Sequence, residues 1–141
     1  MTVHAVQLRP DELADAWPDI EPLVALACAR SSGKITTPDV ARDLARGAIH
    51  LWAGITADHP RPVKVILIGQ FVEYPRLRSF RPFAVVGDDL ATWIDLLPAI
   101  ERWAQANGAR LIEPLGRPGW ERVLRARGYK KTHVLMEKAL P

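Results

Sequence analysis

The stretch IERWAQANGARLIE, residues 100–113, decides the fold of this chain. Ile100 and Trp103 stand at helical spacing, and Gly108 is suited to end the helix because glycine takes a left-handed backbone at little cost. The apolar run over 109–115 then predicts a strand. A helix closed by glycine and followed directly by a strand is typical of an α/β fold.

The helical pattern of this stretch begins earlier in the sequence. Apolar side chains recur on one helical face over 88–107, and Asp88 suits the positive end of a helix. Pro98 lies inside the pattern. We therefore expect either a kink at Pro98 or a second helix that restarts with Pro98 at its first position.

The region after residue 115 predicts one more helix and one more strand. Arg117-Pro118-Gly119 leads into a short helix over 120–127, which Gly128 ends. The apolar and β-branched residues over 129–138 predict a last strand.

Three strands are predicted in the middle of the chain. They cover 49–56, 63–74 and 79–86, and turn-forming residues separate them at 58–62 and 75–78. Two consecutive hairpins of this kind form an antiparallel meander.

The first 47 residues predict a strand and two helices. The strand covers 3–8, and an apolar helical stretch over 11–29 contains Pro18 and Pro22, so we expect a kinked or split helix whose better half is 20–30. Thr37 is predicted to cap a second helix that runs to about Arg46. The whole order is β-α-α-β-β-β-α-β-α-β, which predicts an α/β domain over 1–141 with a mixed central sheet and helices on both faces.

Composition limits the classes of protein that fit. The chain has 141 residues, 48% of them hydrophobic, and a net charge of +3, which permits an acidic partner without requiring one. Its single cysteine, Cys28, favours a reducing compartment such as the cytoplasm. We expect no membrane partner, since no apolar run could span a bilayer, and no metal, since the four histidines are not paired at ligand spacing.

Two parts of the sequence resemble the GNAT family of N-acetyltransferases. Residues 100–113 are similar to the family's long third helix, its closing glycine and the next strand, and 123–129 are similar to the short helix that ends in Gly-Phe or Gly-Tyr. The resemblance covers nearly the whole chain and implies a GNAT-like (acyl-CoA N-acyltransferase) fold. It also implies acetyl-CoA as the cofactor if the protein is active.

The chain also resembles short proteins with this fold pattern that tailed bacteriophages encode. The similar features are Tyr74-Pro75-Arg76, the acidic start of the helix at Asp88 and Gly116-Arg117-Pro118-Gly119-Trp120. This resemblance implies a phage virion protein or a host protein as partner, and the host cytoplasm or the virion as location.

The family's cofactor turn is only partly matched. GNAT enzymes hold the acyl-CoA pyrophosphate with the turn Gln/Arg-x-x-Gly-x-Gly/Ala at a helix N-terminus, where small residues admit the phosphates. Here the matching positions read DDLATW over 88–93, so Asp88 replaces the basic or amide residue and Trp93 would fill space meant for phosphate. The residues that would hold the cofactor are Val86, Gly87, Ala91 and Thr92.

The family's acid and base positions are also altered. The tyrosine that serves as general acid in the family is matched by Leu124, four residues before Gly128. Glu73 and Glu113 are the candidate general bases, since both are expected near the ends of adjacent strands, where a buried carboxylate with a raised pKa could take a proton from an amine.

Basic residues gather in two parts of the sequence. Their arginines could contact nucleic acid or another polyanion, and they could equally form a solvated face. The candidate binding residues are Arg76, Arg78, Arg81, Arg117, Arg122 and Arg125.

Three hypotheses for function remain open from the sequence. The first is a non-catalytic or atypical GNAT-like binding protein, associated with a virion and with a degenerate acyl-CoA site. The second is an active acetyl-CoA-dependent N-acetyltransferase with a rearranged phosphate turn. The third is a basic nucleic-acid-binding module.

Overall fold

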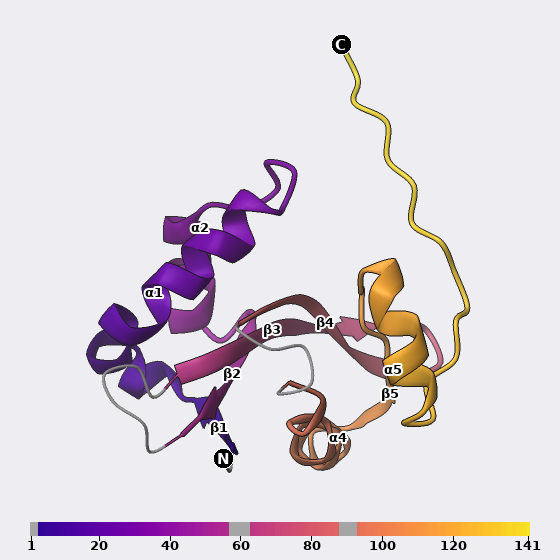
Figure 1. The fold of residues 1–141 in the computed structure, drawn as a ribbon, viewed down its shortest axis with the longest axis horizontal. Coiled ribbons are helices and arrows are strands. Elements are labelled where there is room, and N and C mark those ends of the chain that lie inside the picture. Colours follow the sequence, from indigo (N-terminus) through magenta and orange to yellow (C-terminus); the bar gives the residue numbers. More distant parts are fainter. Residues whose placement is uncertain (1–2, 57–62, 88–92) are drawn as a thin grey trace.

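The computed structural model describes residues 3–56, 63–87 and 93–141 (Figure 1). In chain order its elements are β1 (His4–Leu8), a 3-10 turn (Pro10–Glu12), α1 (Leu13–Ala29), α2 (Thr37–Ala45), β2 (His50–Ile55), β3 (Val63–Glu73), β4 (Arg78–Gly87), α4 (Leu97–Ala106), β5 (Ala109–Ile112), a second 3-10 turn (Pro118–Trp120) and α5 (Glu121–Arg125).

The strands form one mixed sheet, as predicted. Within the described residues the sheet has five strands in the order β1-β2-β3-β4-β5. Strands β1 to β4 pair with one another in antiparallel fashion, so the predicted meander of β2, β3 and β4 is confirmed. Strand β5 runs parallel to β4.

Helices cover both faces of the sheet, which also confirms the prediction. Figure 1 shows α1 and α2 on one face and α4 on the other, with α5 near β5. Ile20 and Val24 of α1 are buried with one side of the sheet, and Leu97 and Ile100 of α4 are buried with the other. The sheet therefore has an apolar core on each side.

Helix α1 is not split, so that alternative of the prediction from its prolines was wrong. It runs unbroken over Leu13–Ala29 and includes both Pro18 and Pro22. Each proline removes one backbone hydrogen bond, but Ile20, Val24 and Ala27 recur on one face and are 5% exposed or less. Their burial against the sheet outweighs the local cost.

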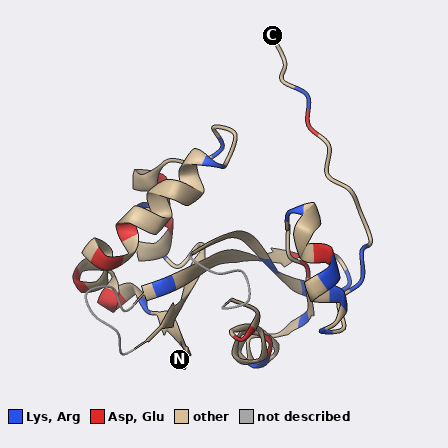
Figure 2. Ribbon diagram, viewed as in Figure 1, with Lys and Arg blue, Asp and Glu red and all other residues tan. Residues whose placement is uncertain are grey.

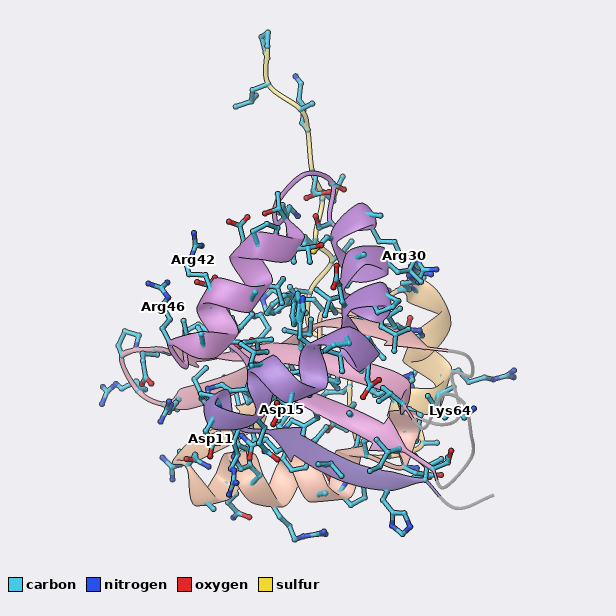
Figure 3. The ribbon with its side chains drawn as sticks, turned by 90° about the vertical axis from the view of Figure 1, so that its left-hand side faces the viewer. Asp11, Asp15, Arg30, Arg42, Arg46 and Lys64 are labelled. Atoms are coloured by element: carbon cyan, nitrogen blue, oxygen red, sulfur yellow. The ribbon has the colours of Figure 1, made fainter. Side chains whose placement is uncertain are left out.

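Helix α2 begins one residue earlier than the sequence predicted. The cap is Thr36, whose hydroxyl accepts from the Asp39 N–H at 3.3 Å, while the Asp39 carboxylate accepts from the Thr36 N–H at 2.9 Å. This reciprocal pair lowers the pKa of Asp39, chiefly through the backbone hydrogen bond from Thr36. Figure 3 shows Arg42 and Arg46 of the same helix pointing away from the sheet.

Helix α4 resolves the alternative raised by Pro98. The helix starts at Leu97, so Pro98 lies in its first turn, where a missing N–H costs nothing. The alternative of a helix that restarts here is thus confirmed, although its first residue is Leu97 and not Pro98. Residues 88–92 of the longer predicted helix lie outside the described part of the chain.

The predicted last strand over 129–138 does not form. In the described residues this segment has no regular secondary structure and pairs with no strand. Residues 129–141, called the tail below, extend away from the domain in Figure 1. The composition of a strand is present, but within the described residues the tail does not pair with either edge strand of the sheet, and a lone extended segment is not a strand.

Candidate active site

Strand β5 pairs with only the first part of β4. They pair from Arg78 to Phe80, and two further hydrogen bonds run from Glu113 N to Phe80 O (2.9 Å) and from Leu115 N to Pro82 O (2.8 Å). No further hydrogen bond joins the two segments beyond Pro82 among the residues described.

A bulge in β4 lies next to the last residue that pairs with the β5 segment. The register between β3 and β4 passes from Ile68 opposite Ala84 to Gly69 opposite Pro82, which leaves Phe83 unmatched. An extra residue of this kind bends a strand and commonly occurs near functional sites. Pro82, which has no N–H, stands next to the bulge and so removes a donor from the ladder there.

Three polar side chains meet where β3, β4 and the end of β5 lie side by side. The Tyr74 hydroxyl donates to Glu113 Oε1 at 2.8 Å, and Arg81 Nη2 donates to the Tyr74 oxygen at 2.9 Å. Arg81 Nη2 also lies 3.4 Å from Glu113 Oε2. We call Tyr74, Arg81 and Glu113 the Glu113 cluster; Tyr74 follows β3, Arg81 lies on β4 and Glu113 follows β5.

The Glu113 cluster holds its carboxylate in the ionised state. Burial raises the pKa of Glu113, but hydrogen bonds from Tyr74 and Ser79 and the charge of Arg81 together bring that pKa below its usual value. The hydrogen bond to Glu113 raises the pKa of Tyr74, so the phenol stays neutral. A general base works best with a pKa near the operating pH, and a carboxylate with a lowered pKa is a weak base.

Glu73, the other predicted base, lies apart from Glu113. Its Oε1 is 2.8 Å from Nε of Arg78, and its side chain is 70% exposed. Strand β4 lies between β3 and β5, so the two glutamates follow strands that are not adjacent, contrary to the expectation. Because side chains alternate along β4, Arg78 with Glu73 and Ser79 with Glu113 lie on opposite faces of the sheet.

The predicted cofactor residues fall into two groups. Ala91 and Thr92 lie outside the described residues. The side chain of Val86 is 3% exposed and belongs to the core beneath α1. A Cβ atom on Gly87 would lie 2.5 Å from the backbone oxygen of Lys64, so the close approach of β3 already explains a glycine at this position.

Trp93 is a core residue. Its side chain is 1% exposed, and its ring lies 5.1 Å from that of Trp120. The indole N–H has no hydrogen-bond partner within the described ranges. A tryptophan packed in this way takes up the space that a small residue of the family's turn would leave open.

Leu124, which the sequence resemblance matches to the family's general acid, has an alkyl side chain. Leu124 is 9% exposed and packs in the core beside α4. Tyr129, five residues on, donates its hydroxyl hydrogen to Glu101 at 2.9 Å, and burial followed by this hydrogen bond raises the pKa of Tyr129. Both tyrosines of the chain therefore donate to carboxylates.

The structure divides the predicted polyanion residues into paired and unpaired arginines. Arg78 pairs with Glu73, Arg81 with Glu113, and Arg125 with Glu121 at 2.6 Å. The other three are exposed and form no ion pair with any described residue; these are Arg76, Arg117 and Arg122. Figure 2 shows basic positions around α5, β5 and the tail. The paired arginines are already neutralised within the fold.

Two features of the site were missed from the sequence. Tyr74 was noted only as part of a phage-like motif, and the link to Glu113 depends on strand pairing that no local pattern reveals. The second feature lies on the opposite face of the sheet, where the ring of His50 lies 5.3 Å from that of Phe71 and 5.2 Å from that of Trp103. Arg78 lies over the Phe71 ring, with Cζ 3.8 Å from its centre.

Two further properties concern metals and membranes. In the ranges 3–56, 63–87 and 93–141, no group of three or more histidine, cysteine or acidic side chains could hold a metal ion. The same ranges contain no helix with the length and hydropathy needed to cross a bilayer.

Comparison with known proteins identifies the fold. No protein-family model and no curated protein matches the sequence. An aminoglycoside acetyltransferase from an uncultured soil metagenomic sample, in complex with sisomicin, superposes with a TM-score of 0.71 at 10% identity, covering 99% of this chain and 97% of that one. A second aminoglycoside acetyltransferase of metagenomic origin gives 0.72 at 13% identity, over 100% of this chain and 99% of that one.

A plant enzyme gives the same result. Glucosamine-6-phosphate N-acetyltransferase from Arabidopsis thaliana superposes with a TM-score of 0.70 at 10% identity, and the match covers 100% of both chains. The identities are low, so these likenesses concern the backbone and not the chemistry. Together with the mixed sheet, they show that this chain has the GNAT acetyltransferase fold.

Proposed function

We propose that this chain is a GNAT-fold binding protein that does not use the family's standard acid–base transfer of an acyl group. The observation that carries the proposal is the state of Glu113. Its hydrogen bond from Tyr74 and its ion pair with Arg81 occupy the carboxylate and lower its pKa. Deprotonation of an acceptor amine needs a free carboxylate of higher pKa.

The acid side of the site supports the same proposal. Release of a thiolate from acyl-CoA calls for a proton donor at the position of Leu124, and an alkyl side chain cannot provide one. Tyr129 is the nearest phenol in sequence, and its hydrogen is donated to Glu101. Neither residue is set to protonate a leaving group.

The described residues do not fit a pyrophosphate well. The backbone of Gly87 is packed closely against β3, so it leaves no room for phosphate on that side. The side chains of Val86 and Trp93 are buried in the core. The aspartates at the matching turn would repel phosphate groups. We therefore assign no step to acetyl-CoA.

The proposed partner is an acidic surface on a virion or host protein. Arg76, Arg117 and Arg122 are exposed and carry charges that no described carboxylate balances. The resemblance to short tailed-phage proteins supports such a partner, and it supports a location in the host cytoplasm or the virion. Nucleic acid could use the same arginines as contacts to phosphate.

The second candidate is an active acetyl-CoA-dependent N-acetyltransferase. The end of the β4–β5 pairing at Pro82, together with the unmatched Phe83, favours it, since the unpaired part of β4 could then contact a pantetheine arm. The solved structures named above are acetyltransferases. In this case Glu113 would have to lose its partners during turnover.

Calorimetric titration with acetyl-CoA decides between the two candidates. We expect no heat of binding up to millimolar ligand. Micromolar binding would contradict the proposal, and the comparison of wild type with Glu113→Gln would then follow: an active enzyme should lose acetyl transfer in the variant while retaining binding. Gly87 variants are unsuitable here, because any side chain at that position collides with β3.

Nucleic-acid binding is tested separately. Duplex DNA and single-stranded RNA are titrated at two salt concentrations with the wild type and with Arg76→Ala, Arg117→Ala, Arg122→Ala. Binding that weakens steeply with salt and is lost in the triple variant would support the nucleic-acid alternative. Absence of binding would favour a protein partner.

A further inference from the structure

A row of exposed side chains follows β5 on one face of the sheet. Phe80 of β4 is buried with α4, so its neighbour Arg81 points to the opposite face, and Glu113 joins it there at 3.4 Å. Backbone hydrogen bonds to β4 keep the chain extended beyond the end of β5. Side chains alternate along an extended chain, so Leu111 and Leu115 point the same way as Glu113.

The two leucines of this row are open to solvent. Leu111 is 50% exposed and Leu115 is 42% exposed. Tyr74, whose hydroxyl reaches Glu113, is 40% exposed beside them. The charge of Glu113 is balanced by Arg81, so the middle of the row is apolar and carries no net charge. Neighbouring large apolar side chains that stay exposed are typical of an interaction site.

Unpaired cations lie at both ends of the row. Arg76 is in the turn between β3 and β4, level with the start of β5, because Arg78 lies opposite Ala109. Arg117 follows Leu115, beyond the other end of the β5 segment. Both Arg76 and Arg117 are exposed and form no ion pair with the residues that the structure describes. We call the following set the β5 face: Tyr74, Arg76, Leu111, Leu115 and Arg117.

We propose that the β5 face binds an extended acidic segment of a partner protein, with apolar side chains between its carboxylates. The inference rests on the proposed function, because it specifies the acidic partner named there. Leu111 and Leu115 stand about 13 Å apart along an extended chain. An extended segment that runs beside them presents its inward side chains at the same repeat, whereas a helix repeats its apolar residues at about 6 or 10.5 Å along its axis.

The order of charges along the β5 face favours such a segment over a nucleic acid. Carboxylates near the two ends of the segment meet Arg76 and Arg117, while its apolar side chains cover the leucines between them. A nucleic acid carries a phosphate on every nucleotide and would hold charge over the apolar middle as well. The contacts come from side chains on the face of the sheet, so they require no backbone pairing with β5.

Fluorescence anisotropy with synthetic peptides tests the proposal on the full chain. The probe is a labelled peptide of about nine residues, roughly 30 Å long when extended, with glutamates at both ends, two leucines four positions apart and serines elsewhere. One control peptide has lysine in place of glutamate, and the other has serine in place of leucine. We expect the probe to bind at least about tenfold more tightly than either control. A probe that does not bind, or that binds no better than a control, would overturn the proposal.

Variants of the chain locate the bound probe. Leu111→Ser and Leu115→Ser change exposed side chains and should each weaken binding about fivefold, because each removes apolar surface that the peptide covers. Val6→Ser is the matched control, since Val6 is 40% exposed on β1, at the opposite edge of the sheet, and this variant should bind like the wild type. Unchanged affinity in both leucine variants would place the peptide elsewhere and refute the β5 face.

The cations are tested by the double variant Arg76→Ala, Arg117→Ala. It should bind the probe about tenfold more weakly at low salt and lose most of the salt dependence, whereas Arg102→Ala, an exposed arginine on α4, should change neither. Displacement of the probe by duplex DNA would assign the arginines to nucleic acid and overturn the proposal. A molar mass of two chains that Leu115→Ser reduces to one would assign the face to a second copy, with the same consequence.

Titration with acetyl-CoA keeps this test separate from that of the proposed function. Micromolar binding of acetyl-CoA would contradict the proposed function whatever the peptide does. If neither acetyl-CoA nor the probe binds, the β5 face is refuted, and the proposal of a non-catalytic binding protein stands.

Discussion

The hydroxyl of Tyr74 lies 2.8 Å from Oε1 of Glu113, although 39 residues separate the two in the chain. The contact joins the end of β3 to the end of β5 across β4. Arg81 of β4 closes the cluster with bonds to both partners. The carboxylate that the sequence predicts as a general base therefore links the ends of β3 and β5 to β4.

Replacement of Glu113 should therefore destabilise the protein. Glu113→Gln removes the charge that pairs with Arg81 and should lower the free energy of unfolding by about 1 kcal/mol. Urea denaturation at neutral pH measures the change. Tyr74→Phe in the same background provides the double-mutant cycle, and strictly additive effects of the two changes would contradict the cluster.

The same carboxylate predicts a dependence of stability on pH. The pKa of Glu113 is lower in the folded chain than in the unfolded chain, so its contribution is complete above the unfolded value of 4.5 and is lost as the pH falls through the folded value. Unfolding free energies measured from neutral to acidic pH should fall less steeply for Glu113→Gln than for the wild type. Parallel curves would show that Glu113 does not titrate differently in the fold.

Local patterns predicted the parts of the fold that depend on local sequence. The helix that contains Ile100, its end at Gly108 and the following strand need only neighbouring residues, and the structure has all three. The prediction that α1 could be split at its prolines was wrong, because burial of Val24 and its neighbours against the sheet is a tertiary effect. The last strand was wrong for a related reason: strand formation depends on pairing with an edge of the sheet as much as on composition, and the described tail does not pair with one.

The candidate site, too, could be predicted from the sequence only in part. Glu113 was selected from its place after a strand, but its chemistry depends on Tyr74 and Arg81, which reach it only once β3, β4 and β5 are aligned. Arg81 itself was grouped with polyanion-binding residues, and no charge count could tell that it pairs inside the cluster. Residue types can be read from the sequence, whereas their partners require the register of the sheet.

A matched pair of glycine variants tests the close approach of β3 and β4. Gly87→Ala would place Cβ 2.5 Å from the Lys64 backbone oxygen, and it should destabilise the protein by about 1–3 kcal/mol. Gly119→Ala is the control, since a Cβ there meets nothing within 4 Å. The midpoints of urea unfolding should separate the two variants, and equal midpoints would contradict the packing described for Gly87.

Arg78 and Arg76 should differ in the same assay. Arg78 lies over Phe71, pairs with Glu73 and donates to the Asn107 carbonyl at 2.8 Å, so Arg78→Ala should lower the unfolding free energy by about 1 kcal/mol. Arg76→Ala should leave stability unchanged, because this exposed side chain has no described ion-pair partner. If both variants behaved alike, Arg78 would be a solvated residue and not a structural one.

His50 gives the last prediction. Burial, followed by the charge of Arg78, lowers the pKa of His50 in the fold, so the unfolded chain binds its proton more readily. Between the unfolded value of 6.5 and the lower folded value, stability must therefore decrease as the pH falls. His50→Phe retains a ring beside Phe71 and Trp103 but cannot titrate. Thermal unfolding across this pH range should show a smaller decrease for the variant, and the difference between the two curves isolates His50 from every other titrating group. An equal decrease would mean that His50 can take up its proton within the fold at no cost, which the rings around it and the nearby guanidinium of Arg78 argue against.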